Sequence, residues 1–313
     1  MQEPPEVTRL ARERVYGPDI QNFQDLAGLP SRMPTVIVPP QGTDPGPPAS
    51  TCNDSTTVTP NCSHPDDAVA HQGEATLDVQ RAGSIAPGAT IDLIASANAG
   101  SVDGIYVAMD YAIDTDPVPA HVLSISYATC EADNSQAVAD GLDGYFSQAA
   151  MEGISVFVAS GDGGVAGCAS LDSAPVPGER LSANILCASS HVTCVGGTEF
   201  ADSADPGRYW SASNSDTYGS ALGYIPEGAW NDPIDDTGAT QVAASGGGAS
   251  VFIPTPSWQT GIGVPAARLG RYTPDVSFAA STREGYFTCI AAQGGSCVVS
   301  SRTDVWVRRC FSC

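Results

Sequence analysis

The first residues that could carry out chemistry are two carboxylates one helical turn apart. Glu74 and Asp78 lie in the segment GEATLD, at positions i and i+4 of an expected helix, so their side chains share one face. A solvated helix face would explain such a pair, because like charges at this spacing cost only about 0.2–0.5 kcal/mol. However, Ala75, Leu77 and Val79 make the helix apolar around the pair, which favours a role in chemistry.

A third carboxylate, Asp162, follows an apolar run in VFVASGDGG. Taken alone, it is explained by a glycine-rich turn in which the side chain accepts local backbone hydrogen bonds. The glycines of SGGGAS, residues 245–250, are explained in the same way by tight turns. In parallel sheets, however, ligands bind beyond the carboxyl ends of the strands. The ends of SISYA and ASGDGG are therefore where we expect a site.

Several other kinds of active site are excluded by the motifs. No HExxH or other ligand spacing occurs among the histidines, which excludes the usual zinc hydrolases, and there is no P-loop, no GxGxxG after a strand and no GxSxG elbow. A subtilisin-type triad with His71 as base lacks both its upstream aspartate motif and its GTS motif. The histidines are scattered, at His64, His71, His121 and His191.

Alternating strands and helices must position the three carboxylates. Helices are expected at 19–30, 66–87 (ending near Gly83), 104–114 and 135–153 (stopped by Gly153); strands are expected at 34–40, 90–97, 121–128, 154–162, 191–200 and 273–281. Near-continuous apolar strands that alternate with helices indicate a parallel sheet covered by helices on both faces. The residues before 35 are polar, with one expected helix, and we find neither an internal repeat nor a clear domain boundary.

The composition excludes some partners. The chain has 35 acidic and 13 basic side chains among 313 residues, for a net charge of −22. This charge argues against nucleic acid and anionic membrane surfaces as partners, and an acidic environment would relieve the self-repulsion. The sequence has no apolar run long enough to cross a membrane. The stretch before Ile20 has no apolar region typical of a signal peptide.

The ten cysteines indicate disulfides and therefore an exported protein. Three pairs each bracket a short loop, and Cys130 with Cys168 remains as a longer-range pair, although spacing alone does not prove the connectivity. Cys310 and Cys313 are left in the tail. The short-range pairs are Cys52 with Cys62, Cys187 with Cys194, and Cys289 with Cys297.

Eight motifs, taken in order, resemble the catalytic domain of the sedolisins (serine-carboxyl peptidases, peptidase family S53), which are acid-acting relatives of subtilisin. They are GEATLD, SISYA, ASGDGG, VTCVGGTEF, GAWND, SGGGAS, PTPSWQ and YTPDVSFAAS, within residues 18–301. The resemblance implies a subtilisin-like α/β fold in one partial catalytic domain over 1–313, and serine-type proteolysis of protein or peptide substrates. For the intact relative it implies an extracellular monomer.

The resemblance also implies roles for particular residues. Glu74 would be the general base for the nucleophile, and Asp78 would hold the other oxygen of Glu74 through a shared proton. Asp162 would be protonated, so that it can donate a hydrogen bond to the oxyanion, as a neutral aspartic acid does in ketosteroid isomerase. The strand from Ser124 to Ala128 would pair with the substrate backbone. The expected substrate-binding residues are Ser124, Ile125, Ser126, Tyr127, Ala128, Ser160 and Gly161.

One element of the family pattern is missing. No SGTSxxxP nucleophile segment occurs after PDVS; instead, the sequence continues into an anomalous tail, 302–313, which is rich in arginine and cysteine. Ser296, Ser300 and Ser301 lack the surrounding motif. We therefore expect a domain that is truncated at both ends, begins after its first sheet strand, and is inactive as it stands. We expect no cofactor or metal, since relatives bind one calcium through C-terminal residues that this chain lacks. The alternative is a non-catalytic peptide-binding module.

Overall fold

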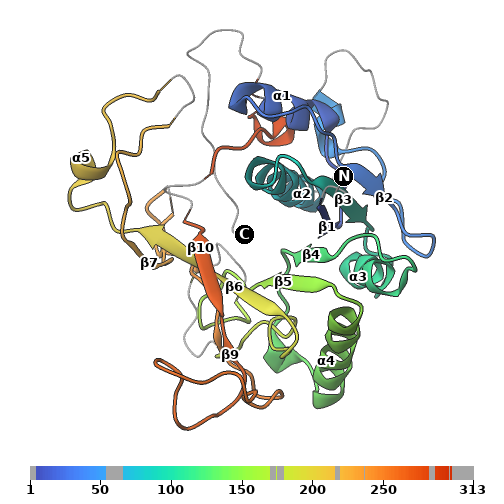
Figure 1. The fold of residues 1–313 in the computed structure, drawn as a ribbon. Coiled ribbons are helices and arrows are strands. Elements are labelled where there is room, and N and C mark those ends of the chain that lie inside the picture. The colour runs from blue at the N-terminus through green and yellow to red at the C-terminus, as the bar shows by residue number, and fades with distance from the viewer. Residues whose placement is uncertain are drawn as a thin grey trace. The chain divides into compact units, whose positions relative to one another are not determined.

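The computed structural model describes residues 5–53, 66–169, 174, 180–215, 219–235, 237–281, 286–295 and 297. The chain forms two compact units, and Figure 1 labels their helices and strands. Unit 1 consists of Met1–Ser124 and Tyr286–Phe311, and unit 2 of Ile125–Gly285 and Ser312–Cys313. Each unit is built on parallel strands, so the chain is mostly parallel α/β, as predicted.

Unit 1 contains a parallel sheet with the strand order β4–β1–β3–β2. The strands are β1 (Glu6–Ala11), β2 (Thr35–Ile37), β3 (Thr90–Ala95) and β4 (Val122–Ile125), the last of which ends at the boundary of unit 2. Within the sheet, β1 lies in parallel register with β3 on one side and β4 on the other. The expectation that no sheet strand precedes residue 34 is therefore wrong.

The reason for this error is Arg9, which lies in the middle of β1. The strand sequence EVTRLA does not look like a strand buried on both faces, because a charged side chain interrupts its apolar residues. Leu10 and Ala11 are nevertheless fully buried. The positive charge of Arg9 is neutralised by a carboxylate of a neighbouring helix, as described below.

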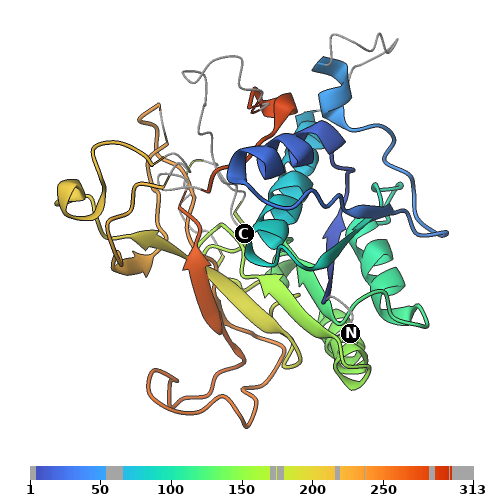
Figure 2. The same ribbon diagram turned by 45° about the horizontal axis from the view of Figure 1, so that its top comes forward.

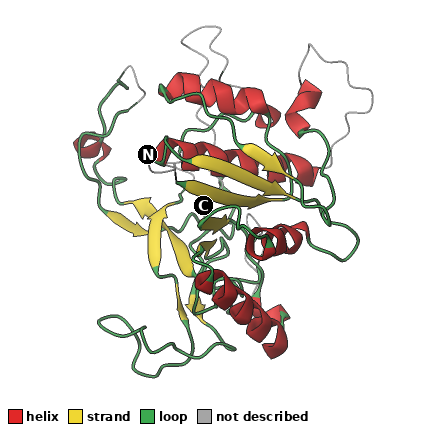
Figure 3. Ribbon diagram, turned by 45° about the vertical axis from the view of Figure 1, so that its right-hand side comes forward, coloured by secondary structure: helices red, strands yellow, loops and turns green. Residues whose placement is uncertain are grey.

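Helices cover both sides of the unit 1 strands, with α2 on one side and α3 on the other (Figure 3). The helices are α1 (Gly17–Ala27), α2 (Asp66–Ile85) and α3 (Gly104–Asp114), with the short 3-10 turns η1 (Ala49–Asn53) and η3 (Ala291–Gln293). The core between α2 and the sheet contains Ala75 and Val79 from the helix and Ala11, Ile91 and Leu93 from the strands. Asp103 caps α3 by accepting a hydrogen bond from the Ile105 N–H.

The late segment 286–295 packs against the early helices of unit 1 (Figure 2). Phe287 stacks on Phe23 of α1, with ring centroids 6.1 Å apart. Arg81 of α2 lies over the Tyr286 ring, 3.6 Å from its centroid. These contacts join the beginning of the described sequence to its end.

A buried carboxylate fixes this late segment. Asp19 of α1 is fully buried, and its Oδ2 accepts hydrogen bonds from the Ala291 N–H at 3.0 Å and the Ser50 hydroxyl at 3.3 Å. Burial raises the pKa of Asp19 to about 6, although both hydrogen bonds act in the opposite direction. Gln80 of α2 supports the same segment, because its side chain bonds both the N–H and the carbonyl of Cys289, each at 2.9 Å.

Unit 2 contains a second set of parallel strands, in the order β5–β6–β10, with β7 antiparallel to β6. Their bounds are β5 (Ser155–Ala159), β6 (Thr193–Phe200), β7 (Glu227–Ala229) and β10 (Val276–Ala279), and β8 (Gly248–Ala249) pairs separately with β9 (Tyr272–Thr273). Loops make up most of the segment between β6 and β10 (Figure 3).

Helix α4 (Gln136–Met151) covers β5 in unit 2. Ser135 caps its first turn by accepting from the Val138 N–H, and the buried side chains of the helix include Phe146 and Ala149. Val156 and Val158 of β5 are also buried. The other described helical elements of this unit are the short α5 (Pro206–Tyr209) and the 3-10 turn η2 (Glu131–Asp133).

The elements found here correct several predicted boundaries. Strand β4 ends at Ile125, so residues 126–128 lie beyond it, and α2 continues past Gly83 to Ile85. Among the described residues, disulfides join Cys130 to Cys168, Cys187 to Cys194 and Cys289 to Cys297. The expected Cys52–Cys62 pair and the tail 302–313 lie outside the residues whose side chains are described. Of the helices that the structure describes, none combines the length and apolarity needed to cross a membrane.

Candidate active site

Helix α2 presents the predicted carboxylate pair to the sheet of unit 1. Asp78 is 1% exposed and Glu74 is half-buried. Ala75, Leu77 and Val79 are all buried, which confirms the apolar surroundings expected from the sequence. An ionised carboxylate is not buried to this extent without compensation, because desolvation is expensive. The pair is therefore not a solvated helix face.

Arg9 supplies the compensation. Its Nη2 lies 2.8 Å from Oδ1 of Asp78, and its Nη1 donates a hydrogen bond to the hydroxyl of Ser124 on β4. Nη2 also lies 3.4 Å from the Asp78 carbonyl oxygen. The guanidinium thus links the predicted carboxylate pair to the first residue of the predicted substrate-binding strand. The sequence analysis did not identify Arg9, because it did not predict the strand that carries this residue.

In unit 2 the chain beyond β4 is held in place by Asn184. The amide Nδ2 of this residue donates to the carbonyls of Tyr127 and Ala159, at 3.0 and 2.8 Å, and its Oδ1 accepts from the Thr129 N–H at 3.0 Å. Ile125 is buried, whereas Ala128 is exposed. The fixed carbonyl of Tyr127 means that this extended segment has a defined backbone although it is not a strand.

The turn that carries Asp162 is held by the SGGGAS segment of the same unit. The N–H of Ala244 donates to the Asp162 carbonyl at 2.8 Å, and the N–H of Gly246 donates to the Gly161 carbonyl at 2.7 Å. A Cβ at Gly246 would lie 2.2 Å from the Ser160 carbonyl oxygen, so only glycine fits there. The glycines of both motifs therefore have a packing role.

Gly161 brings the Asp162 turn close to the predicted substrate-binding segment. Its φ is +101°, a conformation that favours glycine, and an added Cβ would lie 3.3 Å from the Cβ of Ala128. Ser160 is buried and donates its N–H to the Val195 carbonyl of β6 at 2.8 Å. Asp162 itself is half-buried. Unit 2 thus brings together most of the predicted substrate-binding residues and Asp162.

Two further groups of this unit escaped the sequence analysis. Glu131 is 1% exposed and accepts hydrogen bonds from the Ser250 hydroxyl and from the Val251 N–H, the latter at 3.0 Å. This carboxylate anchors the end of SGGGAS to η2. Neither Glu131 nor Asn184 has a local sequence signal, because their partners lie far away in the chain. Ser250 follows Glu131 by 119 positions, and Thr129 precedes Asn184 by 55.

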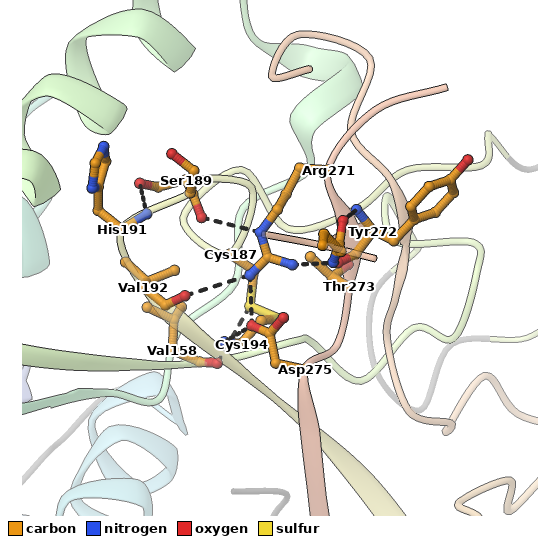
Figure 4. Close-up of polar contacts among 12 residues, drawn as sticks. Val158, Cys187, Ser189, His191, Val192, Cys194, Arg271, Tyr272, Thr273 and Asp275 are labelled. Carbon is orange, nitrogen blue, oxygen red and sulfur yellow. Dashed lines mark hydrogen bonds and ion pairs between the residues drawn. A yellow bond between two sulfur atoms is a disulfide. The ribbon is translucent and has the colours of Figure 1, made fainter. Parts of the chain in front are cut away.

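Arg271 organises the amino ends of β6 and β10 (Figure 4). It is fully buried, and its Nη2 lies 2.5 Å from Oδ2 of Asp275. The same guanidinium donates to the carbonyls of Ser189 and Tyr272, among others. Asp275 in turn accepts from the Cys194 N–H at 2.8 Å. This network supports the strands of the site from the end opposite to the Asp162 turn.

One group of side chains has to be considered as a metal site. Within the described parts of the chain, Cys130, Asp133 and Cys168 are the only potential ligands that lie close enough together to hold an ion. The two cysteines form a disulfide, so neither offers a thiolate. This group does not fit a metal.

Unit 1 thus contains Glu74, Asp78 and Ser124, and unit 2 contains Asp162 with the remaining predicted substrate-binding residues. Ser296, Ser300 and Ser301 lie outside the described residues.

The chain is similar to known proteins. No family model matches the chain. It is 34% identical to sedolisin of Pseudomonas sp. (strain 101) over 220 residues, which cover 68% of this chain and 33% of the relative. It is 31% identical to kumamolisin of Bacillus sp. (strain MN-32) over 240 residues, covering 73% of this chain and 37% of the relative. The chain thus spans about a third of the length of these curated relatives.

A solved structure gives the same result. Pseudomonas sedolisin, a serine-carboxyl proteinase complexed with two molecules of pseudo-iodotyrostatin, superposes with a TM-score of 0.63 and 28% identity. The match covers 94% of this chain and 71% of that structure. Because the sequence identity to Pseudomonas sedolisin extends over two thirds of the chain and the structural match extends along nearly all of it, the chain belongs to the sedolisin family.

Proposed function

We propose that this chain provides the acid–base, oxyanion-binding and substrate-binding parts of a serine-carboxyl endopeptidase that cuts proteins or peptides in acid. The observation that carries this proposal is the buried Asp78 one turn from Glu74 on the face of α2 that packs against the sheet. A buried carboxylate that is paired with a cation and lies one turn from a second carboxylate is typical of a functional site. Membership of the sedolisin family supports assigning the pair to the acid–base chemistry of peptide-bond cleavage.

In the proposed reaction, Glu74 takes the proton of the attacking hydroxyl and returns it to the leaving amine. A carboxylate suits this role in acid, because a general base works best near its own pKa. Asp78 orients Glu74 from the next turn of the helix. Asp162 in its protonated form donates a hydrogen bond to the oxyanion, while the segment from Ser124 to Ala128, together with Ser160 and Gly161, binds the substrate backbone.

The nucleophile is the missing part of this proposal. The printed sequence contains no SGTSxxxP segment, so we propose that these residues alone bind substrate without cleaving it. Non-catalytic peptide binding is therefore the second candidate function, since the substrate-binding segment has a defined backbone while the nucleophile motif is absent. We further propose that both units belong to one partial catalytic domain, monomeric and exported, which holds no calcium within these residues.

Two assays on the purified chain test these proposals. The first measures cleavage of a denatured protein at about pH 4, beside Glu74→Gln as the control for acid–base chemistry. The second measures binding of fluorescent peptides made from the same protein by anisotropy. Peptide binding without cleavage supports the non-catalytic candidate. Cleavage that the control abolishes means that a serine of this chain completes the site, with Ser296, Ser300 and Ser301 the first to replace. The absence of both activities contradicts the proposed function.

A further inference from the structure

Arg9 occupies a position where a cation is costly. It lies in β1 between two other strands, in register with Leu93 of β3 and Ser124 of β4. Its side chain is only 13% exposed. Long charged side chains are rarely buried to this extent unless they are paired. A structural role alone would cost less with an aliphatic side chain, such as those of Leu10 and Ala11 in the same strand.

The side chain of Arg9 points toward α2. Alternate residues of a strand face the same side, so Arg9 shares its face with Ala11. Ala11 packs in one cluster with Ala75 and Val79 of α2. Arg9 therefore reaches the helix face that carries Glu74, and its ion pair with Asp78 follows from this geometry.

The neighbouring strands, β3 and β4, place no further charge on this face among their described residues. Leu93, the β3 partner of Arg9, belongs to the same apolar cluster, and Ile91 does too. Asp92 lies between them and is in register with Thr8, so it points to the opposite face of the sheet. From β4, the group that meets Arg9 is the uncharged hydroxyl of Ser124.

The helices packed against β1 carry other charged or titratable groups. On α2, His71 lies one turn before Glu74, and Arg81 stacks on Tyr286. On α3, which also packs against β1, Asp110 and Asp114 are exposed.

Two carboxylates near these helices are bound to other partners. Asp103, at the start of α3, is paired with Arg12. Asp19 of α1 bonds Ser50 and Ala291. Among the described residues, Arg9 is the basic side chain with a recorded ion pair to this carboxylate pair.

We propose that Arg9 is a positioning residue that supplies, as a fixed charge, the positive charge that a shared proton would otherwise provide between Glu74 and Asp78. An arginine keeps its charge throughout the acid range. Asp78 then stays ionised against Arg9 and accepts hydrogen bonds without holding a proton. Glu74 remains ionised, and so able to act as a base, further into acid than a carboxylate pair that must share one proton.

This proposal rests on the proposed function for the roles of Glu74 and Asp78, but its first test requires no activity. The unfolding constant is measured by urea denaturation at about pH 3.5 and about pH 6.5 for the wild type, Arg9→Met and Arg9→Lys. Removing the cation leaves Asp78 buried without the charge of Arg9, so it must take up a proton on folding. At each pH, the unfolding constant of Arg9→Met is divided by that of the wild type. We expect this ratio to be at least about tenfold larger at the higher pH. Arg9→Lys should retain most of the pairing.

The matched control is the double variant Arg9→Met with Asp78→Asn, in which the pH dependence of the Arg9→Met cost should disappear. An equal cost of Arg9→Met at both pH values would overturn the proposal, and so would a pH dependence that persists in the double variant. If Arg9→Met alone does not fold, the double variant decides: recovery of a cooperative transition supports the proposal, and failure to recover refutes it.

A second test applies if the chain cleaves peptides, alone or when the nucleophile segment is supplied. The acid limb of its pH profile should move to higher pH by about one unit in Arg9→Met and stay in place in Arg9→Lys. An unmoved limb would refute the role of Arg9 in setting the charge of the pair. A wild type that neither cleaves nor binds peptides would refute the proposed function and leave the unfolding test unaffected.

Discussion

The buried Asp19 predicts that this protein becomes less stable as the pH rises from acid to neutral. Its pKa is about 6 in the folded chain against 3.8 for an ordinary aspartate, because burial disfavours the charged form. A raised pKa means that the stabilising contribution is complete below about pH 3.8 and is lost as the pH rises through about 6. The change is 6 minus 3.8, or 2.2 pH units, which corresponds to about 3 kcal/mol.

Asp19→Asn removes the titration while preserving the shape of the side chain and an oxygen that can accept from Ala291 and Ser50. We expect the variant to differ little from wild type at about pH 3.5 and to be more stable by up to about 3 kcal/mol at about pH 7. The measurement is the free energy of unfolding from urea denaturation at several pH values. Asp25→Asn, an exposed site on the same helix, is the control for removing one charge from a chain of net charge −22.

The reasoning would be refuted by a difference between Asp19→Asn and wild type that is constant across this pH range. It would also be refuted if Asp25→Asn changed the free energy of unfolding with the same pH dependence, because the loss of one negative charge would then explain the effect. Glu13 gives an independent check of the principle, because burial raises its pKa to about 7 at a site that is 8% exposed. The stability that Glu13 contributes in its protonated form should therefore persist to higher pH than the stability contributed by Asp19.

Three further changes have expected outcomes. Arg271→Met should cost about 3–5 kcal/mol in urea denaturation, because it leaves a carboxylate partner and several backbone carbonyls without their donor; a cost below about 1 kcal/mol would show that water replaces the guanidinium. Replacing both cysteines of the Cys130–Cys168 disulfide by serine should cost about 4 kcal/mol, since the bond closes a loop of 38 residues. A matched loss of the Cys289–Cys297 bond, which closes 8 residues, should cost about 2.5 kcal/mol, and the reverse order would contradict the loop-entropy argument. Gly246→Ala should weaken peptide binding more than it weakens folding, because the new Cβ would displace the turn that carries Asp162; unchanged binding, measured by anisotropy, would show that the turn adjusts.

The elements with strong local signals were predictable from the sequence. Helix α3 matches its predicted bounds, because GIYVAMDYAID follows an aspartate cap and continues with helical periodicity. Strand β5 and helix α4 were found for similar reasons. The carboxylate pair on α2 was also found, since a helical spacing of four residues can be read directly from the sequence.

The parts that were missed depend on partners far away in the sequence. Strand β1 was missed because Arg9 is explained only by Asp78, 69 residues later. Asn184 and Glu131 were missed because a buried polar side chain looks the same in a sequence as an exposed one. The predicted strand at 121–128 was too long, because Asn184 and not a neighbouring strand bonds the Tyr127 carbonyl.

The return of residues 286–295 to unit 1 has a consequence for how the protein is made. Unit 1 contains residues from Met1 to Ser124, yet it is completed only after the whole of the stretch from Ile125 to Gly285 has been added. At about 5–20 residues per second, synthesis of that stretch takes roughly 8–32 s. Throughout that interval Phe23 has no Phe287 to stack on, and Asp19 has no Ala291 to bond. A nascent chain therefore presents the unfinished surface of α1 and α2 to the cell long before it can be covered, so chaperones should bind there during translation.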